Sequence, residues 1–245
     1  MTAFQEAVDL GYRYLETDIR ASKDGVLMVF HDATLQRTTD GTGKVNMRTR
    51  AELQSLDAGY RFERDGGHVY RGVGIGIPTF DELMLTYREA VFSVDMKENG
   101  LEVSLADAIE RLDLWDRVIV GSFSGARLKR FRKLVQRPVA TAAGRAEVAR
   151  FVANTRAGRA GKITSDSMQV PVKYGRITVV DRKMVAAVHA AFKQVIVWTI
   201  NDGDEMRALL DMGVDGIITD RPDILRHVME DRQSGGPWHD VARRG

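Results

Sequence analysis

Two carboxylates, Glu16 and Asp18, lie two residues apart in an apolar run that ends at Ile19. Alternate side chains of a β-strand point to the same face, so both carboxylates share one face of the expected strand. An apolar strand has little reason to carry two negative charges on one face unless a cation or a proton transfer compensates them. The pair therefore predicts a charged functional site, although either residue alone could be a surface position or an ion-pair partner.

Two further strand ends carry residues that can do chemistry. Asp95 and Lys97 show the same spacing at the end of the run 91–96, and His31 and Asp32 follow the apolar run 26–30. Carboxylates without any thiolate select a hard ion, meaning Mg²⁺, Ca²⁺ or Mn²⁺ rather than zinc. A hard cation and a lysine, beside a histidine that transfers protons near neutral pH, can bind a phosphate diester and expel an alkoxide. We therefore predict a metal-assisted phosphodiester site.

Other conspicuous residues carry weaker signals. Trp198 lies within an apolar run, where one strand parity would make it a pocket wall and the other a core residue under a helix. The basic segment 127–133 could touch membrane phosphates, yet a solvated helix face explains it equally well. The remaining histidines do not close a strand, so we expect surface or helix-packing roles for His68, His189, His227 and His239.

The elements that must position these residues alternate between helices and apolar strands. Runs 12–19 and 26–30, joined by the turn at 23–25, predict an antiparallel hairpin. A long irregular segment, 33–76, follows, with one short helix near 51–56. From residue 78 onward, helices of about ten residues connect the strands, which indicates parallel β/α units. The expected parallel strands centre on Leu15, Val94, Val120, Ala140, Ile163, Val197 and Ile218.

These units predict an α/β protein with a (β/α)₈ TIM barrel. Seven parallel strands are one short of closure, and the chain opens in a helix, so we expect the first strand to lie upstream of Met1. We expect a single barrel domain over 1–230 and a polar tail over 231–245.

Composition excludes several functional classes. The 36 Lys+Arg and 34 Asp+Glu give a formal charge of +2, which argues against nucleic acid or an anionic bilayer as the main partner. The absence of cysteine excludes disulfides, thiolate zinc sites and cysteine nucleophiles. No apolar run is long enough to predict membrane insertion, and the N-terminal residues do not resemble a signal peptide, so we predict a cytoplasmic protein. A missing N-terminal segment could have carried such a signal, and the oligomeric state stays open.

The segment from Gly11 to Gly43 resembles the glycerophosphodiester phosphodiesterases, through Glu16-Thr-Asp18, His31-Asp32 and Arg37-Thr38-Thr39. Further matching motifs follow in order along nearly the whole chain: Leu56-Asp-Ala-Gly59, Ile77-Pro78-Thr79, Asp95-Met-Lys97, Ser122-Phe123, Val197-Trp198-Thr199 and Gly216-Ile-Ile-Thr219-Asp220. The resemblance implies a TIM-barrel enzyme that uses a divalent cation to hydrolyse small-molecule glycerophosphodiesters to glycerol 3-phosphate and an alcohol.

Carried over position by position, the resemblance implies roles for six residues. Glu16, Asp18 and Asp95 would be metal ligands, with Asp95 standing where the family usually has glutamate. His31 would be one of two acid/base histidines. Lys97 would bind the phosphate, and Trp198 would form an aromatic wall of the substrate pocket.

One part of the family pattern is missing. Family members begin with a strand ending in His-Arg-Gly, followed by Pro-Glu-Asn, and this chain starts just after that point. We therefore expect an N-terminally truncated family member. Two alternatives stay open: a catalytically impaired or inactive barrel that still binds a phosphodiester or metal, and a related phospholipase-type diesterase that releases a cyclic phosphate.

Overall fold

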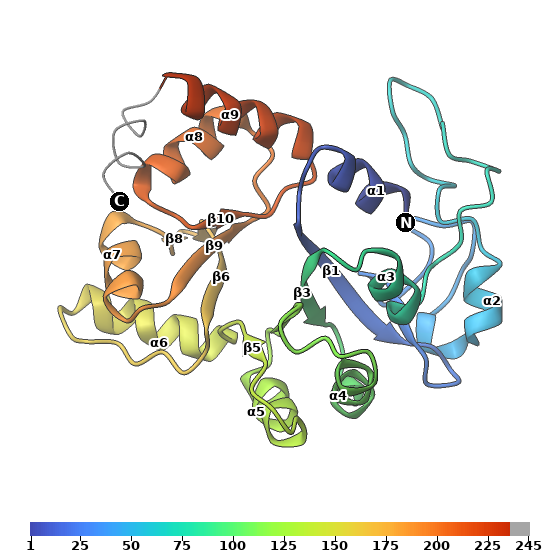
Figure 1. Cartoon of the computed structure of the whole chain (residues 1–245), viewed down its shortest axis with the longest axis horizontal. Coiled ribbons are helices and arrows are strands. Elements are labelled where there is room, and N and C mark those ends of the chain that lie inside the picture. Colours follow the sequence, from blue (N-terminus) through green and yellow to red (C-terminus); the bar gives the residue numbers. More distant parts are fainter. Residues whose placement is uncertain (236–245) are drawn as a thin grey trace. The chain divides into compact units, whose positions relative to one another are not determined.

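The computed structural model describes residues 1–235, which form two compact units (Figure 1). The first unit comprises Met1–Glu6 and Tyr12–Gly144. The second comprises Ala7–Gly11 and the chain from Arg145 onward. The single barrel domain expected over 1–230 stays a prediction.

The first unit contains a five-stranded sheet in the order β2-β1-β3-β4-β5. β1 pairs with β2 in antiparallel fashion, which confirms the predicted hairpin, whereas β1, β3, β4 and β5 are parallel neighbours. Burial alternates along β1 and β3, so one face of each strand packs into the core and the other carries the polar residues. The strands are β1 (Tyr14–Ala21), β2 (Leu27–Val29), β3 (Val91–Met96), β4 (Val118–Gly121) and β5 (Ala140–Thr141).

Helices connect the parallel strands, as the alternating pattern predicted. α3 begins with a capping box: Thr79 Oγ1 accepts from the Glu82 amide, while the Glu82 carboxylate accepts from the Thr79 amide. At the start of α4, the Glu102 carboxylate accepts from the amide of Gly100 at 2.8 Å. The helices that involve this unit are α1 (Thr2–Asp9), η1 (Val45–Met47), α2 (Arg50–Gln54), α3 (Phe80–Thr86), α4 (Leu101–Arg111) and α5 (Gly125–Leu134).

The long segment 33–76 is anchored by apolar side chains of its own. Leu35, Val45 and Leu53 are buried against Met28 of β2 and Ile77. These three side chains hold residues 35–53 of the segment beside the hairpin. Burial of each one stabilises the folded state by roughly 1.5–3 kcal/mol. The loop that follows the hairpin is therefore part of the packed structure.

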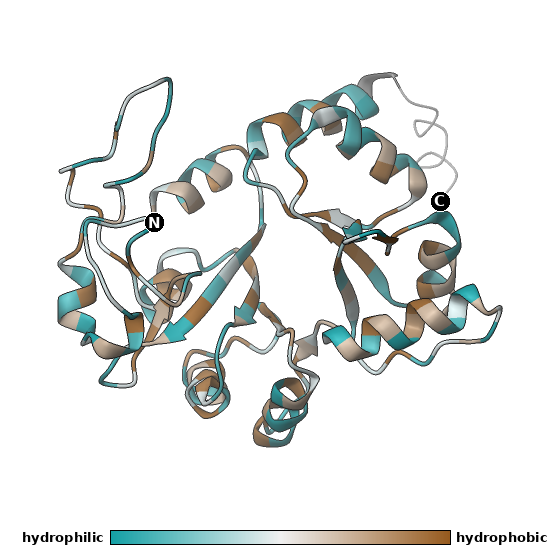
Figure 2. Ribbon diagram, turned by 180° about the vertical axis from the view of Figure 1, so that it is seen from behind, coloured by the Kyte–Doolittle hydropathy of each residue, from teal (hydrophilic) through white to brown (hydrophobic). Residues whose placement is uncertain are grey.

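The second unit contains a three-stranded parallel sheet in the order β10-β9-β6 and a separate two-stranded hairpin. Hydrophobic residues are prominent along the strands of the five-stranded sheet and of the three-stranded sheet (Figure 2). The strands are β6 (Ser167–Pro171), β7 (Lys173–Tyr174), β8 (Ile177–Thr178), β9 (Gln194–Trp198) and β10 (Gly216–Ile217). The helices are α6 (Arg145–Arg156), α7 (Arg182–Ala190), α8 (Gly203–Met212) and α9 (Pro222–Gly235).

The second unit differs from the sequence-based expectations in three places. The strand expected around Ile163 begins instead at Ser167, because the Glu147 carboxylate accepts from the amides of Thr164 and Ser165 and holds them outside the sheet. The β7–β8 hairpin was not predicted. Residues 231–235 of the expected polar tail belong to α9, while 236–245 lie outside the described residues.

Within residues 1–235, seven strands have parallel partners, as the sequence predicted. The closed eight-stranded barrel and the strand expected upstream of Met1 stay predictions. Over the same residues, every helix is too short or too polar to cross a membrane.

Substitution of Phe92 tests how much the packing of this β3 side chain stabilises the fold. Its side chain is fully buried and meets the Phe4 ring edge-on at 5.9 Å. Phe92→Ala is expected to lower the free energy of unfolding by about 3–5 kcal/mol through the cavity it leaves. Phe192→Ala is the matched control, because Phe192 is 96% exposed, and its effect should stay within about 0.5 kcal/mol. Chemical denaturation measures both, and equal effects would refute the assigned core.

Candidate active site

The register of two parallel strands brings the first two predicted site residues together. Asp18 of β1 and Asp95 of β3 are direct register partners. Lys97, which follows β3, places its Nζ 2.7 Å from Asp18 Oδ1 and 2.9 Å from Asp95 Oδ2. All three side chains are largely buried. One ammonium group thus joins two carboxylates that would otherwise repel each other across the sheet.

Burial and charge act against each other in this cluster. Burial raises the pKa of the Asp95 carboxyl, and Lys97 opposes that rise. Burial by itself lowers the pKa of Lys97, but the neighbouring Asp95 and Asp18 outweigh it and raise that pKa overall. Lys97 is therefore a firmly charged cation at the carboxyl end of the sheet.

The β1–β2 hairpin delivers His31 to the same end of the sheet. The Phe30 amide donates to the carbonyl of Asp18 at 2.9 Å, which fixes the backbone immediately before the histidine. Arg20 Nε donates to the carbonyl of His31 at 2.9 Å. Arg20 is itself held by Glu98, whose carboxylate also accepts from the amide of Ala21 at 2.8 Å. The backbone on both sides of the hairpin is therefore tied down next to Asp18.

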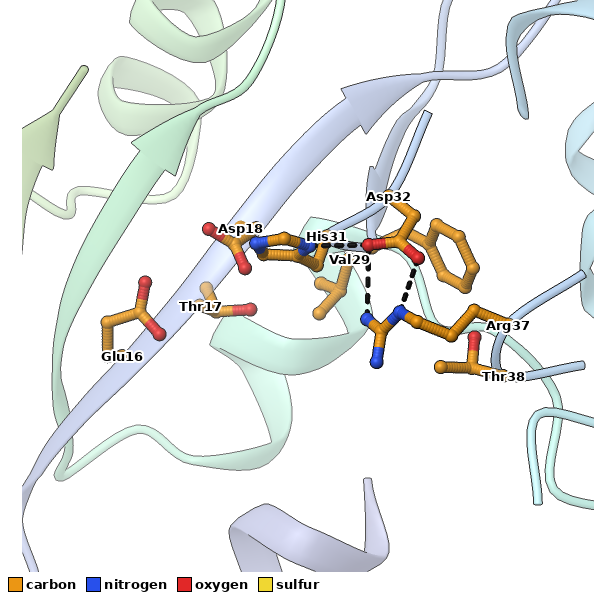
Figure 3. Close-up of a pocket in the computed structure, with 9 residues that line it drawn as sticks. Glu16, Thr17, Asp18, Val29, His31, Asp32, Arg37 and Thr38 are labelled. Carbon is orange, nitrogen blue, oxygen red and sulfur yellow. Dashed lines mark hydrogen bonds and ion pairs between the residues drawn. The ribbon is translucent and has the colours of Figure 1, made fainter. Parts of the chain in front are cut away.

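His31 opens onto a cavity of about 240 Å³ at the end of the hairpin (Figure 3). The cavity is lined by polar and charged side chains from β1 and from the loop after β2, and by apolar Val29 and Phe30 at the end of β2. Its lining residues are Glu16, Thr17, Asp18, Val29, Phe30, His31, Asp32, Arg37 and Thr38. The structure thus brings Glu16, Asp18 and His31 to one cavity, and Asp18 also connects this cavity to Asp95 and Lys97.

The types and the arrangement of the acidic groups decide whether this site fits a divalent cation. The donor chemistry suits a hard ion, because all three predicted ligands are carboxylates. The arrangement does not, since Lys97 already lies between Asp18 and Asp95. Within residues 1–235, no three histidine or acidic side chains stand close enough together to hold an ion. A cation at Asp18 and Asp95 would have to displace the Lys97 ammonium group.

The residues that line this cavity do not include Trp198 or three of the remaining histidines. Trp198 ends β9 in the second unit, where it pairs with Pro171 and lies on the face opposite buried Val195 and Val197. Its role as an aromatic wall stays a prediction. His68 contacts the Phe62 carbonyl, His189 contacts Asp215 and His227 lies 3.8 Å from Asp231, whereas His239 lies outside the described residues.

Three residues at this site escaped individual assignment from the sequence. Asp32 and Arg37 line the cavity, and Glu98 holds the start of the hairpin. Asp32 and Arg37 lie within six residues of His31, so the signal was an acid and a base directly after the candidate histidine. Nothing in the sequence pattern distinguishes Glu98 from an ordinary surface carboxylate.

Removal of the Lys97 charge tests the cluster. Lys97→Met leaves two largely buried carboxylates facing each other, and we expect it to lower the free energy of unfolding by about 3 kcal/mol at pH 7. Lys129→Met on the exposed side of α5 is the matched control, with an expected effect within about 0.5 kcal/mol. Denaturant titration measures both variants. Equal stabilities would show that Lys97 does not hold the carboxylates together.

Comparison of the sequence with known proteins identifies a family. Residues 1–224 match the model of the glycerophosphoryl diester phosphodiesterase family. Among curated relatives, the probable glycerophosphodiester phosphodiesterase 2 of Mycobacterium tuberculosis is 37% identical, with 97% of this chain and 86% of the relative covered. The glycerophosphodiester phosphodiesterase of Bacillus altitudinis is 29% identical, with 94% of this chain and 92% of the relative covered. Coverage of this extent does not support the expected truncation.

Solved structures agree at the level of the fold. The glycerophosphoryl diester phosphodiesterase domain of a Mycobacterium tuberculosis protein matches with a TM-score of 0.79 at 21% identity, covering 94% of this chain and 92% of that one. An Oleispira antarctica phosphodiesterase, solved with the product sn-glycerol-3-phosphate, matches with a TM-score of 0.70 at 23% identity, covering 94% and 89%. The chain has the α/β fold of these enzymes, and it belongs to the glycerophosphoryl diester phosphodiesterase family.

Proposed function

We propose that this protein hydrolyses glycerophosphodiesters to sn-glycerol 3-phosphate and an alcohol. The observation that carries the proposal is the cavity beside β1, which a histidine lines together with carboxylates, one of which, Asp18, is paired with the buried Lys97. Membership of the family supports the reaction class. The product named for the Oleispira antarctica relative supports glycerol 3-phosphate as the product here.

The reaction requires a proton transfer and a positive charge near phosphorus. Water loses a proton as its oxygen adds to phosphorus, the bond from phosphorus to the alcohol oxygen breaks, and the departing alkoxide takes a proton. Imidazole is the side chain best suited to general acid–base catalysis, and His31 lines this cavity, so we assign one of these proton transfers to it. Lys97 is a fixed ammonium at the edge of the same acidic cluster, and we assign it to the phosphoryl oxygens.

A divalent cation remains part of the proposal on chemical grounds. Glu16, Asp18 and Asp95 are the residues that would hold it, and the ion would supply charge stabilisation to the phosphate. The present arrangement does not fit such an ion, because Lys97 occupies the space between two of the three carboxylates. We therefore derive no step through the metal and leave the choice among Mg²⁺, Ca²⁺ and Mn²⁺ to experiment.

One observation favours a second candidate function. Among the described residues that line the cavity, His31 is the single histidine, whereas the mechanism implied by the family resemblance uses two. A protein with one acid/base group could bind a phosphodiester without turning it over. A diesterase that stops at a cyclic phosphate is the alternative within the enzyme class.

The proposed activity is tested with glycerophosphocholine and ³¹P NMR, which separates glycerol 3-phosphate from a cyclic phosphate. We expect glycerol 3-phosphate as the product, and a loss of at least about 100-fold in kcat for His31→Ala because its proton transfer is removed. His227→Ala, on the exposed face of α9, is the matched control and should keep wild-type activity.

Each other result selects an alternative. Accumulation of a cyclic phosphate would replace the proposed hydrolysis with the phospholipase-type reaction. Binding of glycerophosphocholine without turnover by the wild-type protein would favour the non-catalytic protein. Equal rates for the wild type and His31→Ala would remove His31 from the mechanism.

Metal dependence is tested by chelation. We expect EDTA to abolish turnover and Mg²⁺, Ca²⁺ or Mn²⁺ to restore it, because carboxylates are the ligands of hard ions and the three charges of Glu16, Asp18 and Asp95 exceed the single charge of Lys97. Thermal unfolding in EDTA serves as the control for loss of structure. Full activity in EDTA with no change in the melting temperature would show that Lys97 alone neutralises the site.

A further inference from the structure

His31 is held by a chain of two further side chains. Its Nδ1 lies 2.6 Å from Asp32 Oδ1. Arg37 reaches the same carboxylate with two nitrogens, Nε at 2.5 Å from Oδ2 and Nη2 at 3.1 Å from Oδ1. All three residues line the cavity, and Figure 3 shows the arginine reaching both oxygens of Asp32, one of which also meets the imidazole.

The arginine determines the charge of the carboxylate. Hydrogen bonding from Arg37, helped by His31 and opposed by burial, lowers the pKa of Asp32 to about 2. Asp32 is therefore ionised at neutral pH and accepts hydrogen bonds without donating any. The nitrogen of His31 that faces it must carry the hydrogen.

We propose that Asp32 and Arg37 are positioning residues that hold His31 as the Nδ1–H tautomer, with Nε2 left as the nitrogen that exchanges protons with substrate. The inference rests on the proposed function, in which His31 transfers a proton. In the neutral ring, a hydrogen on Nδ1 leaves the lone pair on Nε2, which faces away from Asp32 (Figure 3).

The imidazole needs such support because its surroundings do not immobilise it. The His31 side chain is 61% exposed, so packing restrains its rotation weakly. The contacts from Arg20 and from the Phe30 amide hold the backbone on either side, but they leave the ring free. Asp32 is the contact that orients the ring, and Arg37 is the contact that orients Asp32.

The pair is also local, which makes it insensitive to movements elsewhere. Leu35, between Asp32 and Arg37 in the chain, is fully buried in the apolar cluster around Met28. This anchor holds the short loop against β2, so Arg37 returns to the carboxylate that precedes it by five residues. The loop after the hairpin thereby supplies the support for the histidine at the hairpin's end.

Kinetics of Asp32→Asn test the inference. The asparagine side chain can donate to Nδ1 and so favours the wrong tautomer. We expect kcat for glycerophosphocholine to fall about 10- to 100-fold, the usual cost of losing a partner that orients a functional histidine, while KM changes less than about twofold. Arg37→Lys should keep most of the activity because it retains the charge, and Arg37→Met should lose more.

A second Asp–Arg pair provides the matched control. Arg221 contacts Asp223 with two nitrogens, at 2.9 and 2.6 Å, with no histidine involved. Asp223→Asn should therefore leave kcat and KM unchanged. If Asp32→Asn and Asp223→Asn are equally active, or if Asp32→Asn changes KM alone, the positioning role is wrong.

¹⁵N NMR of the His31 ring tests the tautomer without reference to turnover. We expect Nδ1–H in the wild type at a pH where the ring is neutral, and loss of that preference in Asp32→Asn and Arg37→Met. An Nε2–H ring in the wild type would overturn the inference even if the enzyme is active. A wild type that makes no glycerol 3-phosphate would overturn the proposed function, while the tautomer would still be read independently. Thermal unfolding confirms that the variants are folded. If Asp32→Asn is not folded, Arg37→Met decides the matter, with Arg37→Lys as its control.

Discussion

The site depends on the parallel register between β1 and β3, which places Asp18 directly beside Asp95. Two carboxylates on neighbouring strands repel each other, and burial makes that repulsion more costly. Lys97 resolves the conflict because it follows the end of β3 and reaches both groups. The antiparallel pairing of β1 with β2 determines where the hairpin ends, because the carbonyl of Asp18 accepts from the Phe30 amide. The two pairings of β1 thus decide the positions of the acids, the lysine and the histidine.

The segment after the hairpin converts this arrangement into a cavity. Loops of such length are commonly mobile or functional, and this one is anchored by buried Leu35, Val45 and Leu53. With that anchor, Arg37 can meet Asp32 and complete the wall beside His31. One loop therefore supplies both the apolar cluster and the polar wall of the cavity. In this family enzyme, which acts on small phosphodiesters, the contacts of His31 come from residues close to it in the chain.

Lys97 neutralises the two carboxylates that a metal ion would otherwise neutralise at this site. The donor set is that of a hard cation, while the geometry is that of a carboxylate pair already neutralised by an ammonium group. Both forms of neutralisation answer the same physical need, since neither carboxylate is stable in a buried position without positive charge nearby. The Lys97 ammonium group thus occupies the position that a metal ion held by Asp18 and Asp95 would need.

Local pattern in the sequence determined the α/β class, the antiparallel hairpin, the seven parallel strands among residues 1–235 and the pairing of Glu16 with Asp18 on one strand face. These features follow from periodicity and short-range turns, which a chain carries in its own order of residues. Tertiary structure alone decided the rest: the start of β6 at Ser167, the salt bridges of Lys97 and the two-pronged contact between Arg37 and Asp32. Those depend on strand register and on buried anchors such as Leu35, which bring together groups whose distance in space is not encoded by their spacing in the chain.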